Sequence, residues 1–148
     1  MHDRTRIRAD EGGDSLYQQM GGESVVRQLV ETFYDIVERE PVGEPLRRLH
    51  LRGNGIAHAR REQFYFLSGF FGGHKLYVER HGHSNVRKMH AHVDVDPAAR
   101  DAWIECMRLA TDRIGLEPGL RARMMLHFTR VAATLVNRSP QDEDAPAS

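Results

Sequence analysis

Apolar residues recur three and four positions apart over long stretches of this chain, and that spacing restricts the fold more than any other feature. In residues 23–38 it places Val26, Val30 and Phe33 on one side of a helix. The same periodicity runs through three further segments, residues 56–71, 97–114 and 118–136. No segment alternates apolar and polar residues as a half-buried strand does. The sequence therefore predicts an all-α fold with four long helices and several short ones.

Glycine and proline mark the expected helix ends. A short helix over residues 15–20 should close at a Gly-Gly pair, and a second Gly-Gly pair should stop the helix that begins near residue 56. Asp96 followed by Pro97 is typical of a helix start, because the carboxylate accepts hydrogen bonds from free backbone N–H groups. We expect short helical pieces at residues 46–49 and 86–90, and an irregular stretch over residues 74–85.

Length and composition limit the classes of protein that this chain can represent. Its 148 residues predict one domain over residues 14–138, with disordered segments at residues 1–13 and 139–148. A net charge of +0 argues against a protein that mainly binds nucleic acid or an anionic membrane. One cysteine permits no internal disulfide, and no apolar run is long enough to cross a bilayer. We expect a soluble cytoplasmic protein, either a monomer or a homodimer.

The connection between residues 72 and 96 is long, and long connections in a compact domain are usually functional or disordered. It is rich in histidine, in a chain with nine histidines, and it also carries tyrosine, arginine and lysine. Such a segment suits a flat cofactor with an apolar body and acidic edges. Haem has this shape, and its iron accepts an axial imidazole.

Several short motifs fall in a recognisable order along the chain. They are Met20-Gly21-Gly22, Phe33-Tyr34, Phe66-Leu67, Phe71-Gly72-Gly73, Tyr77, Glu79, Gly82-His83, Arg87, His90-Ala91, Arg100-Asp101-Ala102-Trp103 and Cys106-Met107. In order and spacing they resemble the group II truncated haemoglobins over about residues 15–137. The resemblance implies a two-over-two helical sandwich around haem b.

The resemblance also implies roles for individual residues. His90 corresponds to the proximal histidine that ligates iron, with its second ring nitrogen bonded to a backbone carbonyl. Tyr34 and Trp103 correspond to residues that donate hydrogen bonds to the bound ligand, although both positions would also suit an ordinary core. Gln63, one turn after the position of a distal histidine, would add another polar group.

The resemblance also implies apolar residues that contact the haem ring and charged residues that bind its propionates. The residues expected to line the cofactor are Phe33, Ala59, Phe66, Leu67, Tyr77, His83, Arg87, Val93, Trp103 and Met107. The chain departs from the family at Met89, where arginine is usual, so Arg87, Lys88 or His83 would pair with the propionates instead.

His50 is the most informative departure from the family, which usually has phenylalanine or tyrosine there. The alignment between His50 and Ala59 also needs one extra residue. Three interpretations stay open: His50 donates to the ligand, it ligates iron when no gas is bound, or it lies on the surface.

These residues lead to two main hypotheses of function. The first is a haem protein that binds O2, NO or CO, retains rather than rapidly transports O2, and oxidises NO or reduces peroxide with a separate reductase. Whether the site turns over as an enzyme is left open. The second is a non-haem helical protein that binds zinc or copper through His74, His81, His83, His90 and His92. A DNA-binding role for Arg121, Arg123 and Arg130 finds little support in the zero net charge.

Overall fold

The computed structural model describes residues 15–52, 55–83 and 95–136, and within these ranges the chain is helical and forms no strand. The helices are α1 (Leu16–Met20), α2 (Glu23–Arg39), the 3-10 turn η1 (Pro41–Gly43), α3 (Glu44–Arg52), α4 (Ile56–Phe70), α5 (Leu76–His81), α7 (Pro97–Arg113) and α8 (Pro118–Leu135). The terminal segments 1–13 and 139–148 and the helix expected at residues 86–90 lie outside the described residues.

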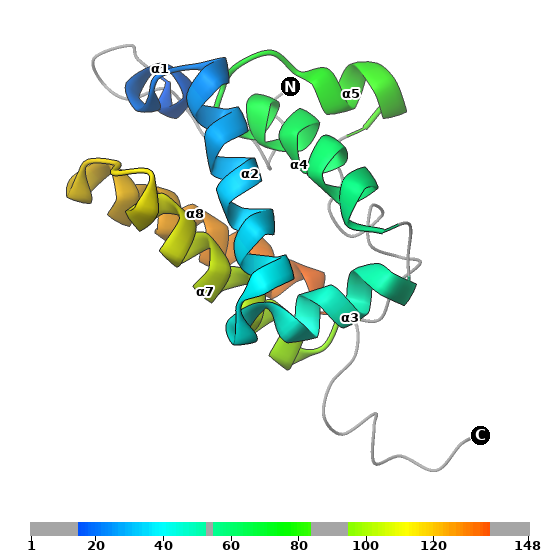
Figure 1. Ribbon diagram of the computed structural model, residues 1–148. Coiled ribbons are helices and arrows are strands. Elements are labelled where there is room, and N and C mark those ends of the chain that lie inside the picture. Colours follow the sequence, from blue (N-terminus) through cyan, green and yellow to red (C-terminus); the bar gives the residue numbers. More distant parts are fainter. Residues whose placement is uncertain (1–14, 53–54, 84–94, 137–148) are drawn as a thin grey trace.

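The four long helices are arranged as two pairs. Helix α2 packs against α4 in one pair, and α7 packs against α8 in the other (Figure 1). Helix α2 also contacts α7, so it joins the two pairs, and α3 bridges from the end of α2 toward α7. This arrangement confirms the predicted all-α, two-over-two sandwich.

The capping residues read from the sequence start the helices as expected. The Asp96 carboxylate accepts a 2.8 Å hydrogen bond from the Ala99 backbone N–H, and Pro97 occupies the first turn of α7. The Glu117 carboxylate caps α8 in the same way, through the backbone N–H groups of Gly119 and Leu120. Gly21 ends α1 with a φ of 118°, which is a conformation that favours glycine.

Two short helices differ from the expectation. Helix α3 is longer than the piece expected at residues 46–49. Helix α5 lies in the stretch that we expected to be irregular, and that prediction was wrong. None of its six residues is fully buried, and six residues are too few to show a periodic apolar pattern. Contacts with α4 hold it, including an edge-to-face contact of Tyr77 with Phe66 at 6.3 Å between ring centroids.

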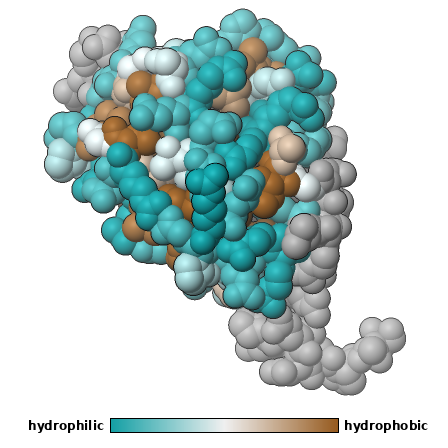
Figure 2. Space-filling model, in the orientation of Figure 1, coloured by the Kyte–Doolittle hydropathy of each residue, from teal (hydrophilic) through white to brown (hydrophobic). Residues whose placement is uncertain are grey.

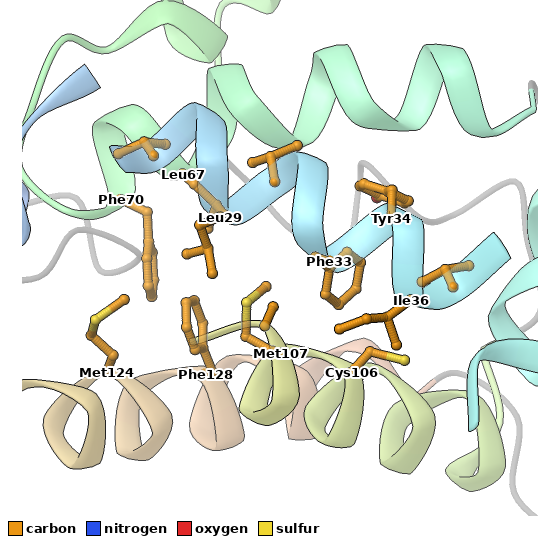
Figure 3. Packing of buried hydrophobic residues seen from close by; sticks show 14 of the residues in the cluster. Leu29, Phe33, Tyr34, Ile36, Leu67, Phe70, Cys106, Met107, Met124 and Phe128 are labelled. Carbon is orange, nitrogen blue, oxygen red and sulfur yellow. The ribbon is translucent and has the colours of Figure 1, made fainter. Parts of the chain in front are cut away.

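One apolar cluster fills the space between the two helix pairs. From α2 come Leu29 and Ile36, which face Met107 on α7 and Phe128 on α8 (Figure 3). Each of these side chains is at most 1% exposed. Phe128 contacts three other aromatic rings at centroid distances between 5.3 and 5.9 Å. The predicted helix faces therefore form a single core.

The face of the molecule shown in Figure 2 is mainly hydrophilic, with small hydrophobic groups scattered over it. Among the described residues, Leu126 on α8 is the one large hydrophobic residue that is exposed, at 51%. None of the helices in the described part of the chain is long and apolar enough to cross a membrane.

Candidate functional site

Tyr34 lies on α2 and is almost completely buried, at 3% exposure. Its ring meets Phe33 edge-on at 4.8 Å between centroids. Burial raises the pKa of the Tyr34 hydroxyl far above its ordinary value of 10.0, and the charge of Arg60 offsets only part of that rise. The hydroxyl makes no hydrogen bond with any residue that the structure describes. It is therefore a protonated donor available to a bound molecule.

His50, on α3, stands beside Tyr34 with its ring perpendicular and 5.6 Å away between centroids. Its Nδ1 lies 2.7 Å from the carbonyl oxygen of Leu46. A carbonyl oxygen can only accept, so Nδ1 carries the hydrogen. Burial lowers the pKa of His50, although the bond to Leu46 works in the opposite direction. Near pH 7 the ring is therefore neutral, and Nε2 presents a lone pair.

This tautomer narrows the interpretations of His50. A neutral ring whose Nδ1 donates to Leu46 can accept a proton or bind a metal at Nε2, but it cannot donate a hydrogen bond there. Donation to a ligand requires the doubly protonated ring.

Trp103, on α7, reaches the same region from the other helix pair. Its indole is half-buried between Phe33, at 5.9 Å between centroids, and Phe128, at 5.3 Å. The indole N–H has no hydrogen-bond partner among the residues described. The structure thus links the three side chains through ring contacts: Phe33 touches Tyr34 and Trp103, and Tyr34 touches His50, although they come from three helices.

Helix α4 supplies the expected apolar wall. Ala59, Gln63 and Phe66 are spaced by four and three residues, so they share one face of the helix, and all three are half-buried. Phe66 stacks on Phe70 at 5.4 Å between centroids. Leu67, in contrast, points into the core at 3% exposure, as do Phe33 and Met107, each at 0%.

Tyr77 and His83 gather beside this wall. Tyr77 contacts Phe66, and its ring lies 5.8 Å from that of His83 and 4.3 Å from that of His81. Burial raises the pKa of Tyr77, and the nearby Glu62 carboxylate adds to that rise. The His81 Nε2 lies 2.8 Å from a Glu62 oxygen. Two of the residues expected at the cofactor edge are thus neighbours.

Three predicted site residues, Arg87, His90 and Val93, lie outside the described residues, so the iron ligand stays a prediction. The histidine cluster of the zinc or copper hypothesis also falls partly there. Within the described ranges, no group of three or more His, Cys, Asp or Glu side chains is placed to hold a metal ion. His74 instead pairs with Glu79 at 2.7 Å.

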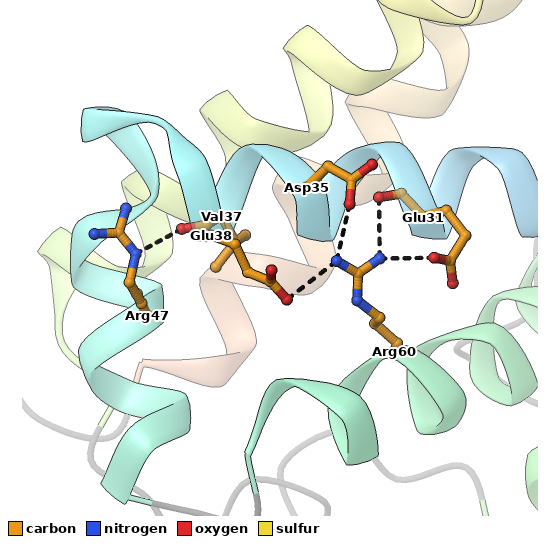
Figure 4. A network of polar contacts seen from close by, with 6 residues as sticks. All are labelled: Glu31, Asp35, Val37, Glu38, Arg47 and Arg60. Atoms are coloured by element: carbon orange, nitrogen blue, oxygen red, sulfur yellow. Dashed lines mark hydrogen bonds and ion pairs between the residues drawn. The ribbon is translucent and has the colours of Figure 1, made fainter.

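Sequence reasoning missed Arg60, on α4, which binds three acidic side chains of α2 (Figure 4). Arg60 also contacts the ring of Tyr34. The available signal was the spacing of Glu31, Asp35 and Glu38, which places three carboxylates on one face of α2. Arg47 is a second missed residue: its guanidinium donates to the carbonyl oxygens of Val37 and Glu40 and so caps the end of α2.

Comparison with known proteins identifies the class of this site. A sequence profile of the family described as bacterial-like globin matches residues 15–137. The group 2 truncated haemoglobin YjbI of Bacillus subtilis is 32% identical over 122 residues, which are 82% of this chain and 89% of that protein. The chain therefore belongs to the bacterial-like globin family, which implies haem and the binding of small gaseous ligands such as O2.

Solved structures narrow the assignment within the family. The group II 2-on-2 haemoglobin from the plant pathogen Agrobacterium tumefaciens superposes with a TM-score of 0.79 at 30% identity, over 88% of this chain and 98% of that one. The truncated oxygen-avid haemoglobin of B. subtilis gives a TM-score of 0.72 at 32% identity, over 84% of this chain and 100% of that one. The chain is a group II truncated haemoglobin, as the sequence resemblance indicated.

The described residues fit haem. Half-buried apolar side chains of α4 and α7, Ala59, Phe66 and Trp103 among them, suit a flat macrocycle. Tyr34 and Trp103 offer donors that no described residue uses. A phenol and an indole usually place their polar atoms against a partner, and a bound ligand can supply one here.

Proposed function

We propose that this protein holds haem b through His90 and binds O2, and also NO and CO, beside Tyr34, Trp103 and His50. The observation that carries the proposal is a chain of ring contacts that joins the indole of Trp103, through Phe33, to the buried phenol of Tyr34 and the neutral imidazole of His50. Haem supplies an iron position for a diatomic gas. The chain supplies two hydrogen-bond donors for a ligand that carries partial negative charge, and such donors slow its release. The related truncated haemoglobin of B. subtilis is oxygen-avid, which supports retention rather than rapid transport.

The remaining residues would hold the cofactor in place. Ala59 and Phe66 on α4 would pack on the apolar ring system, together with Val93, while Leu67 and Met107 lie in the core. Tyr77, His83 and Arg87 would contact the propionates, because hydroxyl and cationic groups pair well with carboxylates. Gln63, on the same face of α4 as Ala59, would add a further polar contact for the ligand.

Ultraviolet–visible spectra of the ferric and ferrous protein test the cofactor and its ligand. We expect an intense haem band that His90→Gly loses or alters, and that added imidazole restores. His92→Gly is the matched control, because it removes a neighbouring histidine and should leave the spectrum unchanged. A wild-type protein with no haem band, even after haem is added, would contradict the proposal and favour the zinc or copper alternative.

A redox activity is the second candidate function. The donor-rich site, which favours holding a ligand over releasing it, supports NO oxidation or peroxide reduction over simple carriage. Turnover requires electrons from a separate reductase, because the sequence carries no flavin or nicotinamide motif. Stopped-flow mixing of the oxygenated protein with NO should show fast oxidation of the haem; slow or absent oxidation would rule out NO dioxygenation.

A further inference from the structure

The Arg60 side chain, on α4, forms several hydrogen bonds and ion pairs with residues of α2 (Figure 4). Its Nη1 donates to a carboxylate oxygen of Glu31 at 2.7 Å and to the backbone carbonyl of the same residue at 3.2 Å. Its Nη2 donates to Asp35 at 2.9 Å and to Glu38 at 3.1 Å. One guanidinium on α4 is thus bound at four points along α2.

The burial of these groups is unequal. The Arg60 side chain is 18% exposed, whereas those of Glu31, Asp35 and Glu38 are 63%, 49% and 40% exposed. Burial alone would lower the pKa of Arg60, but hydrogen bonds to Asp35 and Glu38 and the charge of Glu31 raise it overall. A charge held mostly out of solvent by a fixed fork of hydrogen bonds has little freedom to move.

The same guanidinium faces the ring of Tyr34. Its central carbon lies 5.7 Å from the ring centroid, within the range of a cation–π contact. Phe33 and His50 meet the same ring edge-on at 4.8 and 5.6 Å. Two of these three neighbours are themselves apolar or neutral, so Arg60 is the one that ties the ring to a charged, directional network.

We propose that Arg60 is a positioning residue for Tyr34: by locking α4 to the carboxylates of α2 and packing on the Tyr34 ring, it sets the direction of the Tyr34 hydroxyl toward the bound ligand. This inference rests on the proposed function, since it acts through the donor role of Tyr34. It predicts that Arg60 affects the ligand without touching it.

The competing explanation is that Arg60 only staples two helices together. A matched control separates the two. Arg27 lies over the ring of Phe64 at 4.1 Å and pairs with Glu23, so it also joins α2 to α4, and no contact connects it to Tyr34. If Arg60 only joins the helices, replacing Arg60 or Arg27 should affect stability and leave the ligand site unchanged. If Arg60 positions Tyr34, replacing Arg60 should also change the ligand site, and replacing Arg27 should not.

The experiment measures the O2 dissociation rate and the stretching frequency of bound CO in the haem-loaded full chain. The variants are Tyr34→Phe, Arg60→Gln, Arg60→Lys, Arg27→Gln, and Arg60→Gln combined with Tyr34→Phe. Loss of one hydrogen bond to the ligand in Tyr34→Phe should speed O2 release by about tenfold, and Arg60→Gln by between about twofold and tenfold. Arg60→Lys keeps the charge but loses the forked set of hydrogen bonds, so its O2 dissociation rate should lie between those of the wild type and Arg60→Gln. It replaces Arg60→Gln in the comparison if that variant does not fold.

The double variant decides whether Arg60 acts through Tyr34. We expect Arg60→Gln to add nothing in the Tyr34→Phe background, and Arg27→Gln to leave both ligand measurements at their wild-type values. An Arg60→Gln protein with an unchanged CO frequency and O2 rate, beside an effective Tyr34→Phe, would overturn this inference alone. An ineffective Tyr34→Phe would overturn the donor role in the proposed function, and the inference with it.

Discussion

Helix α2 has one interface that is apolar throughout and another that adds a charged network. Toward α7 and α8 it presents Leu29 and Ile36, both 0% exposed, against an apolar core. Toward α4, which adds apolar residues to the same core, it also presents Glu31, Asp35 and Glu38, which bind Arg60. Apolar burial contributes much to the free energy of folding but does not depend on direction. Hydrogen bonds between charged groups contribute less at a surface, but they fix the orientation of the groups that they join. We therefore expect changes on the α7–α8 side to affect stability most, and changes to the Arg60 network on the α4 side to affect the ligand site through Tyr34.

Truncation of the apolar side should have the largest effect on stability. Phe128 is 1% exposed and contacts Phe70, Phe71 and Trp103. Phe128→Ala should lower the free energy of unfolding by about 3–5 kcal/mol, because it removes buried area and leaves a cavity. Chemical denaturation of the haem-loaded protein measures this loss.

Leu126→Ala on the same helix is the control, and its exposed side chain should cost no more than about 0.5 kcal/mol. Arg60→Gln on the charged side should cost less than Phe128→Ala, since its partners are solvent-exposed. A larger loss for Arg60→Gln than for Phe128→Ala would reverse the comparison.

Placing a polar atom in the apolar interface between α2 and α7 should lower stability by less than the truncation of Phe128. Cys106 is 0% exposed, and burial, with smaller contributions from Glu40 and Glu105, raises the pKa of its thiol to about 11. Cys106→Ser should lower the free energy of unfolding by about 1–3 kcal/mol, because a hydroxyl costs more to desolvate than a thiol. Thermal or chemical denaturation provides the measurement.

Cys106→Ala separates this cost from the loss of sulfur. The alanine variant should be more stable than the serine variant, although serine is closer in size to cysteine. Equal stabilities would show that a backbone carbonyl of α7 satisfies the new hydroxyl, and that this interface tolerates polarity.

The sequence anticipates the apolar interface far better than the charged one. Residues 23–38 and 56–71 were expected to be helical, and α2 and α4 each end within one residue of that expectation. Local signals suffice there, because periodic apolar residues and capping groups report on the same helix. Helix α5 was missed because it is only six residues long, and its contacts with α4 hold it in place.

The residues of the candidate site also differ in how far the sequence predicts them. The grouping of Tyr34, His50 and Trp103 follows from the family resemblance, because nothing in the residue spacing alone joins α2, α3 and α7. Arg60 escaped notice because a charged residue on an amphipathic helix suggests a solvent-exposed face. Its partners lie more than twenty residues earlier in the chain. Only the packing of α4 on α2 shows that this arginine is mostly buried.

The smallest expected effect is on the pH dependence of stability and of O2 release. The prediction compares a histidine beside Tyr34 with a histidine on α8. His50 lies beside Tyr34, and His127 lies on α8. Burial lowers the pKa of both below 6.5, with Arg130 adding to the effect at His127. The unfolded chain therefore takes up protons first as the pH falls through 6.5. Each residue contributes stability that is present above that pH and lost as the pH falls toward its folded-state pKa.

His50→Phe and His127→Gln should each flatten the acid side of the stability curve, but only His50 should alter the ligand. Above pH 6.5 its neutral ring has no hydrogen at Nε2, because the bond to Leu46 occupies Nδ1. Protonation at lower pH adds a donor beside Tyr34, so O2 release should slow as the pH falls in the wild type and in His127→Gln. That slowing should be absent in His50→Phe. An identical pH profile of O2 release in all three proteins would place His50 away from the ligand and leave Tyr34 and Trp103 as the donors.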